Sequence, residues 1–280
     1  NMISEILLEM HGSGKPSMTI RIAIPSYQRS DQLKSKTLRV LEKHKIDPSM
    51  VDIFVANDEE KAKYTEALKD DIYQNIIVGE RGMGAIRRFI QQYYPEGTKV
   101  MNFDDDLVDI LRKESDKKMV PVENLMEQVI ERGFDELEKS GAHLFGIYAA
   151  ANAMFMKHRV SVGLYYCIGS CWGVITRHDK ELSVTLDDKE DFERTLQHYV
   201  KDGAIVRLDD ITVKTKYYGT GGMQEERTEE RITKSADELV ERFPGLCKKF
   251  IRNTTGHAEL RLKDTRGIAK GDGASLEGFF

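Results

Sequence analysis

The 280-residue sequence lacks any run of about 20 apolar residues, which excludes a transmembrane helix. It also lacks a basic segment followed by an apolar core near its start, so we expect no secretory signal. Cysteine is scarce, and its odd count of three argues against a disulfide framework and favours a reducing, cytoplasmic compartment. Cys167 and Cys171 have no paired cysteine or histidine partners of a zinc site, so we expect them in the core.

A strong excess of one charge is also missing. The net charge of -5 and the pI near 5.9 argue against a generic nucleic-acid coat protein, although an acidic enzyme can still carry a basic patch. Hydrophobic residues make up 40% and charged residues 32%, which is enough for a core beneath a well-solvated surface. The basic residues form three clusters: Arg81 with Arg87 and Arg88, Lys214 with Lys216, and the region from Lys248 to Lys270. Composition alone does not show whether such a cluster is an ordinary solvated surface or a binding site for a polyanion.

The first half of the sequence alternates short β-branched runs with amphipathic segments. Strands are predicted over residues 19–24, 51–55, 74–78 and 99–103, and helices from residue 30, over 61–68 and over 85–93. This order predicts an α/β fold with a mostly parallel sheet and helices on both faces. Ligands of such sheets bind beyond the carboxyl ends of the strands, where Pro25 to Tyr27, Asn57-Asp58, Gly79 to Arg81 and Asp104 to Asp106 all fall.

The second half is less regular. Its pattern predicts a long helix over 122–137, strands and turns over 144–156 and 160–175, and a helix that opens at residues 187–190 and stops at Gly203. Residues 204–208 and 211–218 are expected to pair as two further strands. Because no linker separates independent parts, we expect one domain over 19–266, between a flexible leader at 1–18 and a flexible tail at 267–280.

The strongest chemical signal is Phe103-Asp-Asp-Asp106 at the end of the fourth predicted strand. Adjacent carboxylates repel one another, at about 1.4 kcal/mol for each unit of raised pKa, so this strand end needs a positive partner. A divalent metal on a diphosphate fits, because magnesium and manganese prefer hard oxygen ligands. The alternative is a solvated acidic turn in which Asp104 or Asp105 caps a helix over 107–112. The position beyond a fourth parallel strand favours the metal.

A second signal is Gly79-Glu-Arg-Gly-Met-Gly-Ala-Ile-Arg-Arg88. Glycine lets the backbone approach a phosphate, and a helix N-terminus offers free N–H groups to it. Arg81, Arg87 or Arg88 would add charge-assisted contacts. The spacing is neither Walker A nor G-x-G-x-x-G, so this loop alone does not identify a nucleotide site.

Taken in order, these motifs resemble the inverting glycosyltransferases of the GT-A fold over residues 20–203. Ile22-Ala-Ile-Pro-Ser-Tyr-Gln-Arg29 is similar to the family's opening, the Gly-rich helix and the Asp triplet to its donor site and DxD motif, and Lys189-Glu-Asp-Phe-Glu193 to its Glu-Asp element. Within the family, the opening and the Tyr-Tyr-Gly-Thr-Gly-Gly-Met-Gln224 segment most resemble the base J and TET-associated DNA glucosyltransferases of kinetoplastids and phages. The sequence departs from the family at Asn57-Asp58-Glu59-Glu60 and at Arg87-Arg88.

The resemblance implies a metal-dependent transfer of a sugar, with glucose expected, from a UDP-sugar to a hydroxyl group. Manganese or magnesium would be the cofactor, residues 19–110 would bind the nucleotide sugar and residues 111–266 the acceptor. The resemblance implies Asp106, Asp104 and His257 as metal ligands, and Asp191 with Glu190 as the catalytic carboxylates. The donor-binding residues that it implies are Pro25, Tyr27, Arg29, Asp58, Arg81, Arg87, Asp104 and Asp105. Residues 190 and 191 equally suit a helix N-terminus, and residue 257 an exposed surface.

The acceptor that the resemblance implies is a 5-hydroxymethylpyrimidine in DNA, in the cytoplasm of a phage- or virus-infected host. A base in duplex DNA must be flipped out, which calls for an aromatic wall and a basic rim. Six residues fit those needs: Tyr165, Tyr166, Trp172, Lys214, Lys216 and Lys248. A lone tryptophan in an apolar run is, however, more often part of a core.

Three other functions stay open at this point. A sugar nucleotidyltransferase combines the same elements, but its Gly-rich loop follows the first strand, where this sequence has Pro-Ser-Tyr-Gln-Arg29. A glycosyltransferase with an acceptor other than DNA is the second. A non-catalytic nucleotide-sugar or DNA-binding module is the third, and it would need neither an Asp triplet nor a second carboxylate in the same cleft. We expect no membrane partner, and the sequence does not determine the oligomeric state.

Overall fold

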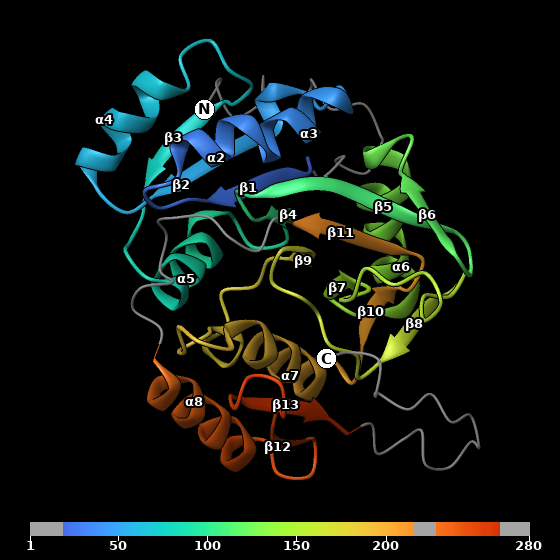
Figure 1. Ribbon diagram of the computed structural model, residues 1–280. Helices are drawn as coiled ribbons and strands as arrows, with labels where there is room; N and C mark the ends of the chain where they lie inside the picture. Colours follow the sequence, from blue (N-terminus) through green and yellow to red (C-terminus); the bar gives the residue numbers. More distant parts are fainter. Residues whose placement is uncertain (1–18, 216–227, 264–280) are drawn as a thin grey trace, which may run out of the picture.

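The computed structural model describes residues 19–215 and 228–263 (Figure 1). The leader, the tail, Lys216 and the 217–224 segment therefore lie outside the described residues. Within the described ranges, no helix is long and apolar enough to cross a membrane. Cys167, Cys171 and Cys247 are buried free thiols, which confirms the core placement expected for the first two.

The centre of the molecule is an eight-stranded sheet in the order β3-β2-β1-β4-β9-β7-β10-β8. The first-half strands are all parallel to one another, as expected. In the other half, β7 and β10 are parallel, whereas β9 and β8 pair antiparallel with their neighbours. The strands are β1 (Arg21–Pro25), β2 (Val51–Val55), β3 (Asn75–Val78), β4 (Lys99–Phe103), β7 (Leu144–Ile147), β8 (Val160–Gly163), β9 (Cys171–Ile175) and β10 (Ile205–Leu208).

Helices cover both faces of this sheet, which confirms the expected α/β class (Figure 1). Ile22 and Ile24 of β1 pack with α2 to α4, whereas Ala23 faces α5, because successive side chains of a strand point to opposite faces. The helices are α2 (Ser30–Ser35), α3 (Thr37–Lys43), α4 (Asp58–Ala67), α5 (Met83–Tyr93), α6 (Arg132–Ser140), α7 (Glu190–Asp202) and α8 (Glu229–Arg242), with short 3-10 turns at Pro48–Met50 and Lys180–Leu182 and a π-helix at Met126–Glu131. The π-helix and α6 together correspond to the predicted long helix.

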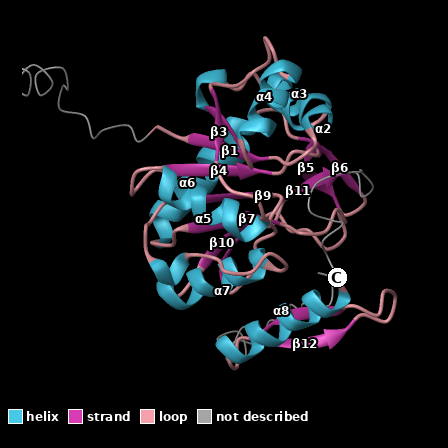
Figure 2. Cartoon of the chain, turned by 90° about the vertical axis from the view of Figure 1, so that its left-hand side faces the viewer, coloured by secondary structure: helices cyan, strands magenta, loops and turns pink. Residues whose placement is uncertain are grey.

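Two smaller sheets complete the fold. The first has the order β11-β5-β6 and consists of β11 (Ile211–Thr215), β5 (Leu107–Ser115) and β6 (Lys118–Pro121). Because β5 follows the Asp triplet directly, no helix over 107–112 exists for an acidic turn to cap, and that alternative is wrong. The second is the ribbon of β12 (Cys247–Ile251) and β13 (Ala258–Leu262), which packs with α8 against Phe192 and Leu196 of α7 (Figure 2).

The expected pairing of 204–208 with 211–218 is also wrong. β10 pairs with β7 and β8, while β11 leaves the central sheet and pairs with β5. Between them lies Asp209, which is fully buried and accepts charge-assisted hydrogen bonds from Arg159 and Arg207 at 2.9 and 2.6 Å. Arg159 and Ser161, which also donates to Asp209, are distant in the sequence and hold the two-residue connection in a corner between two sheets, where local sequence suggests a hairpin.

The core is packed tightly around Phe145 of β7. A Cβ atom added to Gly173 would lie 2.1 Å from Cε1 of this buried ring, and one added to Gly133 would lie 2.3 Å from its Cε2. Phe134 contacts the same ring edge-on, at 5.2 Å between centroids. The ring therefore fills a slot that only glycine on both sides leaves open.

We expect Gly173→Ala to lower the free energy of unfolding by about 2–3 kcal/mol, because the added methyl group overpacks the slot. Urea denaturation measures the effect. Phe145→Leu shortens the side chain in the slot, so the double variant should recover part of the loss relative to the sum of the single changes. An unchanged denaturation midpoint for Gly173→Ala would contradict this packing.

Candidate active site

Two neighbouring cavities open beyond the carboxyl ends of β1, β2 and β4. The smaller, of about 270 Å³, is lined by the turn after β1, the end of β2, the loop before α5 and the Asp triplet. Its lining residues are Pro25, Ser26, Tyr27, Arg29, Phe54, Val55, Ala56, Glu80, Arg81, Gly82, Met83, Ile86, Asp104, Asp105 and Asp106. The structure thus gathers at one place the β1 turn, the Gly-rich loop and the Asp triplet, which are far apart in the sequence.

The larger cavity, of about 800 Å³, continues from the smaller one and shares Met83, Asp104 and Asp106 with it. Its other walls come from the β7–β8 loop, the segment before β9, the start of α7, β11, α8 and β13. They are Ala149, Ala151, Tyr166, Ile168, Gly169, Ser170, Asp187, Asp188, Lys189, Glu190, Asp191, Val213, Lys214, Thr215, Arg231 and Glu259. Carboxylates outnumber cations on this lining seven to three, so the larger cavity is acidic.

The three aspartates of the triplet have different surroundings. The buried Asp105 accepts a 2.7 Å hydrogen bond from Ser26 Oγ and lies 3.6 Å from Arg29 Nε. Burial raises the pKa of its carboxyl to about 6, against the opposing effects of Arg29 and Ser26. Asp105 therefore ties β4 to the β1 turn, and its oxygens are largely occupied by these partners.

Asp104 and Asp106 are the two aspartates that face both cavities. Asp106 lies 3.2 Å from Arg29 Nη2, and Asp104 lies 3.3 Å from Arg87 Nη2. Burial raises the pKa of Asp104 to about 7, Arg87 lowers it, and the other two aspartates add to the rise. A buried carboxylate with poor solvation is strongly stabilised by a cation bound next to it.

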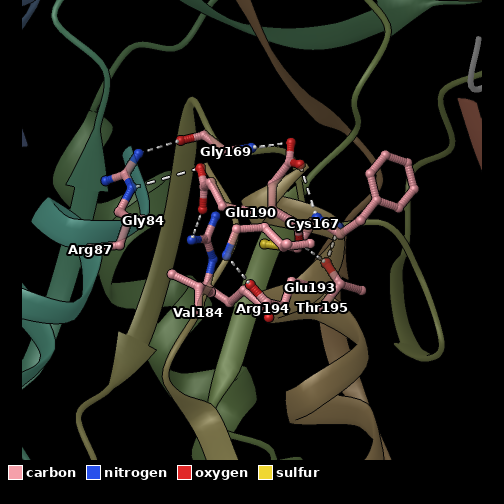
Figure 3. Close-up of polar contacts among 12 residues, drawn as sticks. Gly84, Arg87, Cys167, Gly169, Val184, Glu190, Glu193, Arg194 and Thr195 are labelled. Carbon is pink, nitrogen blue, oxygen red and sulfur yellow. Dashed lines mark hydrogen bonds and ion pairs between the residues drawn. The ribbon is translucent and has the colours of Figure 1, made fainter. Parts of the chain in front are cut away.

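Arg87 was expected to contact the donor, but its side chain is buried and does not line the smaller cavity. Figure 3 shows its guanidinium beside Gly169 and Glu190. Its Nη2 lies 3.3 Å from the Gly169 carbonyl oxygen, and its Nε lies 3.8 Å from Glu190 Oε1. It also lies over the Trp172 ring, at 5.5 Å from the centroid. Arg87 therefore links the carboxylate of Asp104 to the start of α7, a role that its place in the Gly-rich helix did not suggest.

Of the two candidate catalytic carboxylates, Glu190 is held by cations. Arg194 Nη1 donates a 2.5 Å hydrogen bond to Glu190, and Arg87 lies on its other side. Asp191 instead accepts hydrogen bonds from the Tyr166 hydroxyl, from Gly169 N at 3.3 Å and from its neighbour Phe192 N at 2.9 Å. Burial and the charge of Glu190 raise the pKa of Asp191, which increases the basicity of its carboxylate.

Of the other residues predicted to bind the donor, four line the smaller cavity and one does not. Pro25, Tyr27, Arg29 and Arg81 line the smaller cavity, and the Arg81 guanidinium lies 5.3 Å from the centre of the Tyr27 ring. Asp58 does not line it, because Asn57 caps α4 and places Asp58 in the first helical turn. Ser26 and Glu80 line this cavity and were missed, although both flank residues that the motifs had identified.

Of the residues predicted to contact the acceptor, some line the larger cavity and others do not. Tyr166 and Lys214 line the larger cavity. Tyr165 does not and stacks with Arg207, and Trp172 is buried with its ring 3.7 Å from Arg194, so the core interpretation of Trp172 is correct. Lys248 lies on β12, outside the lining. Asp187 and Asp188, expected at the start of a helix, also line this cavity. Arg231 and Glu259 were missed, since no motif marks them and they come from the distant α8 and ribbon.

His257 is not brought to the aspartates. It lies in the β12–β13 turn, 3.4 Å from Glu229, and lines neither cavity. Among residues 19–215 and 228–263, no group of three or more His, Cys, Asp or Glu side chains could hold a metal by itself. Asp104 and Asp106 nevertheless fit magnesium or manganese, because these ions are commonly bound through one or two carboxylates together with substrate phosphates.

No protein-family model matches the sequence, and no curated protein matches it. Among solved structures, the chain is similar to TarS 1-349 from S. aureus, with a TM-score of 0.51 and 16% identity over 80% of this chain and 66% of that one. It is also similar to a mycobacterial protein, with a TM-score of 0.51 and 11% identity over 89% of this chain and 84% of that one. The chain therefore spans slightly less than two thirds of the TarS fragment.

A third structure is glucosyl-3-phosphoglycerate synthase from Mycobacterium tuberculosis in complex with Mn²⁺, uridine-diphosphate and glucosyl-3-phosphoglycerate. Its TM-score is 0.47, at 10% identity over 89% of this chain and 88% of that one, which is too low to bear on function. At such identities the first two likenesses show the fold alone. They agree with the α/β fold of GT-A type that the sequence predicts.

Proposed function

We propose that this protein is a metal-dependent inverting glycosyltransferase that moves a sugar, glucose by expectation, from a UDP-sugar to a hydroxyl group. One observation carries the proposal: Asp104 and Asp106 lie where the two cavities join, and Asp191 lines the larger one. Such an arrangement suits a donor diphosphate at the junction and an acceptor hydroxyl close to Asp191, which would act as the general base. The class of enzyme, the cofactor and the cytoplasmic location all belong to this proposal.

The smaller cavity is the donor site in this proposal. Tyr27 would contact the nucleoside, and Arg81 would contact the diphosphate. Gly82 and Met83 bring the N-terminus of α5 to the same wall, and the φ of +108° at Gly82 is one that glycine adopts without strain. Free N–H groups at the start of a helix favour phosphate oxygens.

In the proposed reaction, the sugar passes from the diphosphate of the donor to the acceptor hydroxyl, with Asp191 as the general base. Asp191 takes the proton of the acceptor hydroxyl as its oxygen forms a bond to the anomeric carbon, and the bond from that carbon to the diphosphate oxygen breaks. The electron pair leaves with UDP, and attack opposite the leaving group inverts the anomeric centre. A manganese or magnesium ion held by Asp104 and Asp106 would stabilise the negative charge of the leaving diphosphate. Tyr166 and Gly169 N keep the Asp191 carboxylate in place through their hydrogen bonds.

For the acceptor we propose a 5-hydroxymethylpyrimidine in DNA. The acidic lining of the larger cavity disfavours a phosphate inside it, whereas a flipped base is uncharged and leaves its phosphates outside. The exposed Lys214 on the lining would meet one of those phosphates. A sugar nucleotidyltransferase is less well supported, because the Gly-rich loop follows β3 and not β1.

The test combines the protein with manganese, a panel of nucleotide sugars and duplex DNA containing 5-hydroxymethylcytosine, and then measures nucleoside masses. A gain of one hexose on the modified nucleoside, with none on unmodified DNA, supports the full proposal. Transfer only to small hydroxylated compounds would leave the transferase in place and reject the DNA acceptor. No transfer and no metal-dependent binding of UDP would reject the glycosyltransferase.

The raised pKa of Asp104 predicts how metal binding depends on pH. Only the ionised carboxylate binds a cation, so this group should raise the affinity for Mn²⁺ with UDP about fivefold between pH 6 and pH 7 and about tenfold by pH 8, where the effect levels off. The metal-free protein should behave oppositely: its folded state keeps the proton to a higher pH than the unfolded chain, so this group's contribution to stability falls from about pH 4 to pH 7.

Calorimetry at pH 6, 7 and 8 measures this dependence. Manganese should accordingly raise the melting temperature more at pH 8 than at pH 6. In Asp104→Asn the affinity should be low and should vary little with pH, apart from a smaller contribution of Asp105, whose pKa is about 6. An affinity for Mn²⁺ with UDP that is equal at pH 6 and pH 8 in the wild type would contradict the prediction.

A further inference from the structure

The loop between β7 and β8 exposes two adjacent large apolar side chains. Met154 is 63% exposed and Phe155 is 47% exposed, whereas the residues on either side, Ala153 and Met156, are buried. Single exposed apolar side chains are common and need no explanation. A pair at the tip of a loop beside a candidate active site is different, because it offers a contiguous apolar surface to a ligand.

Hydrogen bonds from the protein interior hold this loop in place. The buried ammonium group of Lys113 donates hydrogen bonds to the carbonyl oxygens of Ala153 and Met156, at 3.0 and 2.8 Å. The Asn152 side chain accepts a hydrogen bond from Met154 N at 3.1 Å. A buried cation that spans the two buried neighbours of the exposed pair makes a rigid support, so the apolar tip is presented outward by the fold.

The tip lies beside the larger cavity. Ala149 and Ala151 of the same loop line that cavity. Consecutive Cα atoms are 3.8 Å apart, so the Cα of Met154 can be no more than about 11 Å from that of Ala151. A ligand that places one group in the larger cavity and leaves it over Ala149 and Ala151 would therefore pass close to the exposed pair.

Positive charge follows the apolar pair directly. Lys157 and His158 are both exposed, and Lys117 is exposed on the β5–β6 turn, next to the Asp116 that Lys113 contacts at 2.6 Å. The surface thus combines an apolar tip with basic groups beside an acidic cavity. This combination complements a polyanion that carries flat apolar groups between its charges, which is the chemistry of a nucleic acid.

We propose that Met154 and Phe155 form a wedge that enters the base stack of duplex DNA beside the nucleotide whose base occupies the larger cavity. The wedge would fill the space that the flipped base leaves, while Lys157 and Lys117 contact the neighbouring phosphates. The inference rests on the DNA acceptor proposed above. An anionic membrane surface fits less well, because recognition of such a surface usually needs four to eight clustered Lys or Arg residues.

Phe155→Trp gives a direct probe, since the single natural tryptophan, Trp172, is only 6% exposed. Its emission should be quenched by duplex DNA that contains 5-hydroxymethylcytosine. In wild-type protein, 2-aminopurine placed next to the modified base should brighten on binding as it unstacks. Met154→Ser with Phe155→Ser should abolish that brightening and weaken DNA binding about tenfold or more. Val200→Ser, at a side chain 61% exposed on α7 and outside both cavity linings, is the matched control and should leave both signals unchanged.

Each result decides between the explanations. DNA binding and unstacking by the double variant at wild-type levels would overturn the wedge. A blue shift of the new tryptophan with phosphatidylserine vesicles, and no quenching by DNA, would overturn it in favour of a membrane contact. Wild-type protein that binds UDP with manganese but no DNA would reject the wedge and the DNA acceptor together and leave the transferase standing. Loss of UDP binding as well would reject the proposed function itself.

Discussion

Replacement of Asp106 by asparagine is expected to remove most of the metal-dependent affinity for UDP and to lower kcat/KM by 10²-fold or more. The side chain lies at the junction of the two cavities, where the proposed metal meets the diphosphate. A bound metal contributes several kcal/mol to charge stabilisation in the transition state, and each 1.36 kcal/mol corresponds to a factor of ten in rate. Asparagine keeps the shape of the side chain but supplies no charge to the metal.

The fold should tolerate this change. Asp106 is partly exposed, and its ion-pair partner Arg29 keeps a second carboxylate, Asp105, at 3.6 Å. Calorimetry with Mn²⁺ and UDP measures the affinity, and thermal denaturation checks folding. Asp109→Asn is the matched control: it also removes one carboxylate, paired with Lys43 at 3.7 Å, but at a position outside both cavities. Equal affinities in the wild type and Asp106→Asn would show that the triplet has no role in holding a metal.

The sequence was sufficient for the layout of the smaller cavity, the proposed donor site. The alternation of strands and helices predicted the parallel order of β1 to β4, and parallel strands place their carboxyl ends at one edge. That rule alone brings the β1 turn, the Gly-rich loop and the Asp triplet together. It does not distinguish between neighbouring aspartates, because the separate role of Asp105 depends on Ser26 and Arg29, contacts that only the folded chain makes.

The larger cavity, the proposed acceptor site, was harder to predict because its walls come from segments that lie far apart in the sequence and follow no common pattern. β11 pairs with β5 across about 100 residues, and the α8 and ribbon segment supplies Arg231 and Glu259 to the lining. Trp172 and Arg87 show the same difficulty: a tryptophan suggests an aromatic wall and an arginine suggests a phosphate contact. In the structure the Arg87 guanidinium lies over the Trp172 ring inside the protein, where it also pairs with the carboxylates of Asp104 and Glu190.

Replacement of Asp191 by asparagine is expected to separate catalysis from binding. Asparagine retains the size and part of the hydrogen bonding of the carboxylate but has no useful basicity, so kcat should fall by about 10²–10⁴-fold. Affinity for Mn²⁺ with UDP should change little, because Asp104, Asp106 and the Gly-rich loop line the smaller cavity and Asp191 does not. The loss of one charge in the first turn of α7 costs the helix only about 0.3–1 kcal/mol.

Tyr166→Phe is the companion variant, because it removes the hydroxyl that donates to Asp191 and leaves the ring stacked on Phe192 at 4.1 Å. It should lower kcat less than Asp191→Asn does, since the base remains but is less well held. Asp237→Asn, at an exposed carboxylate of α8 that lines neither cavity, should leave kcat unchanged. The measurements are single-turnover sugar transfer, UDP calorimetry and thermal denaturation. If Asp191→Asn transfers sugar at the wild-type rate, Asp188 or Glu190 becomes the candidate base. If the variant unfolds, the carboxylate is structural, because its hydrogen bonds from Tyr166 and Gly169 then hold the start of α7 to the loop before β9.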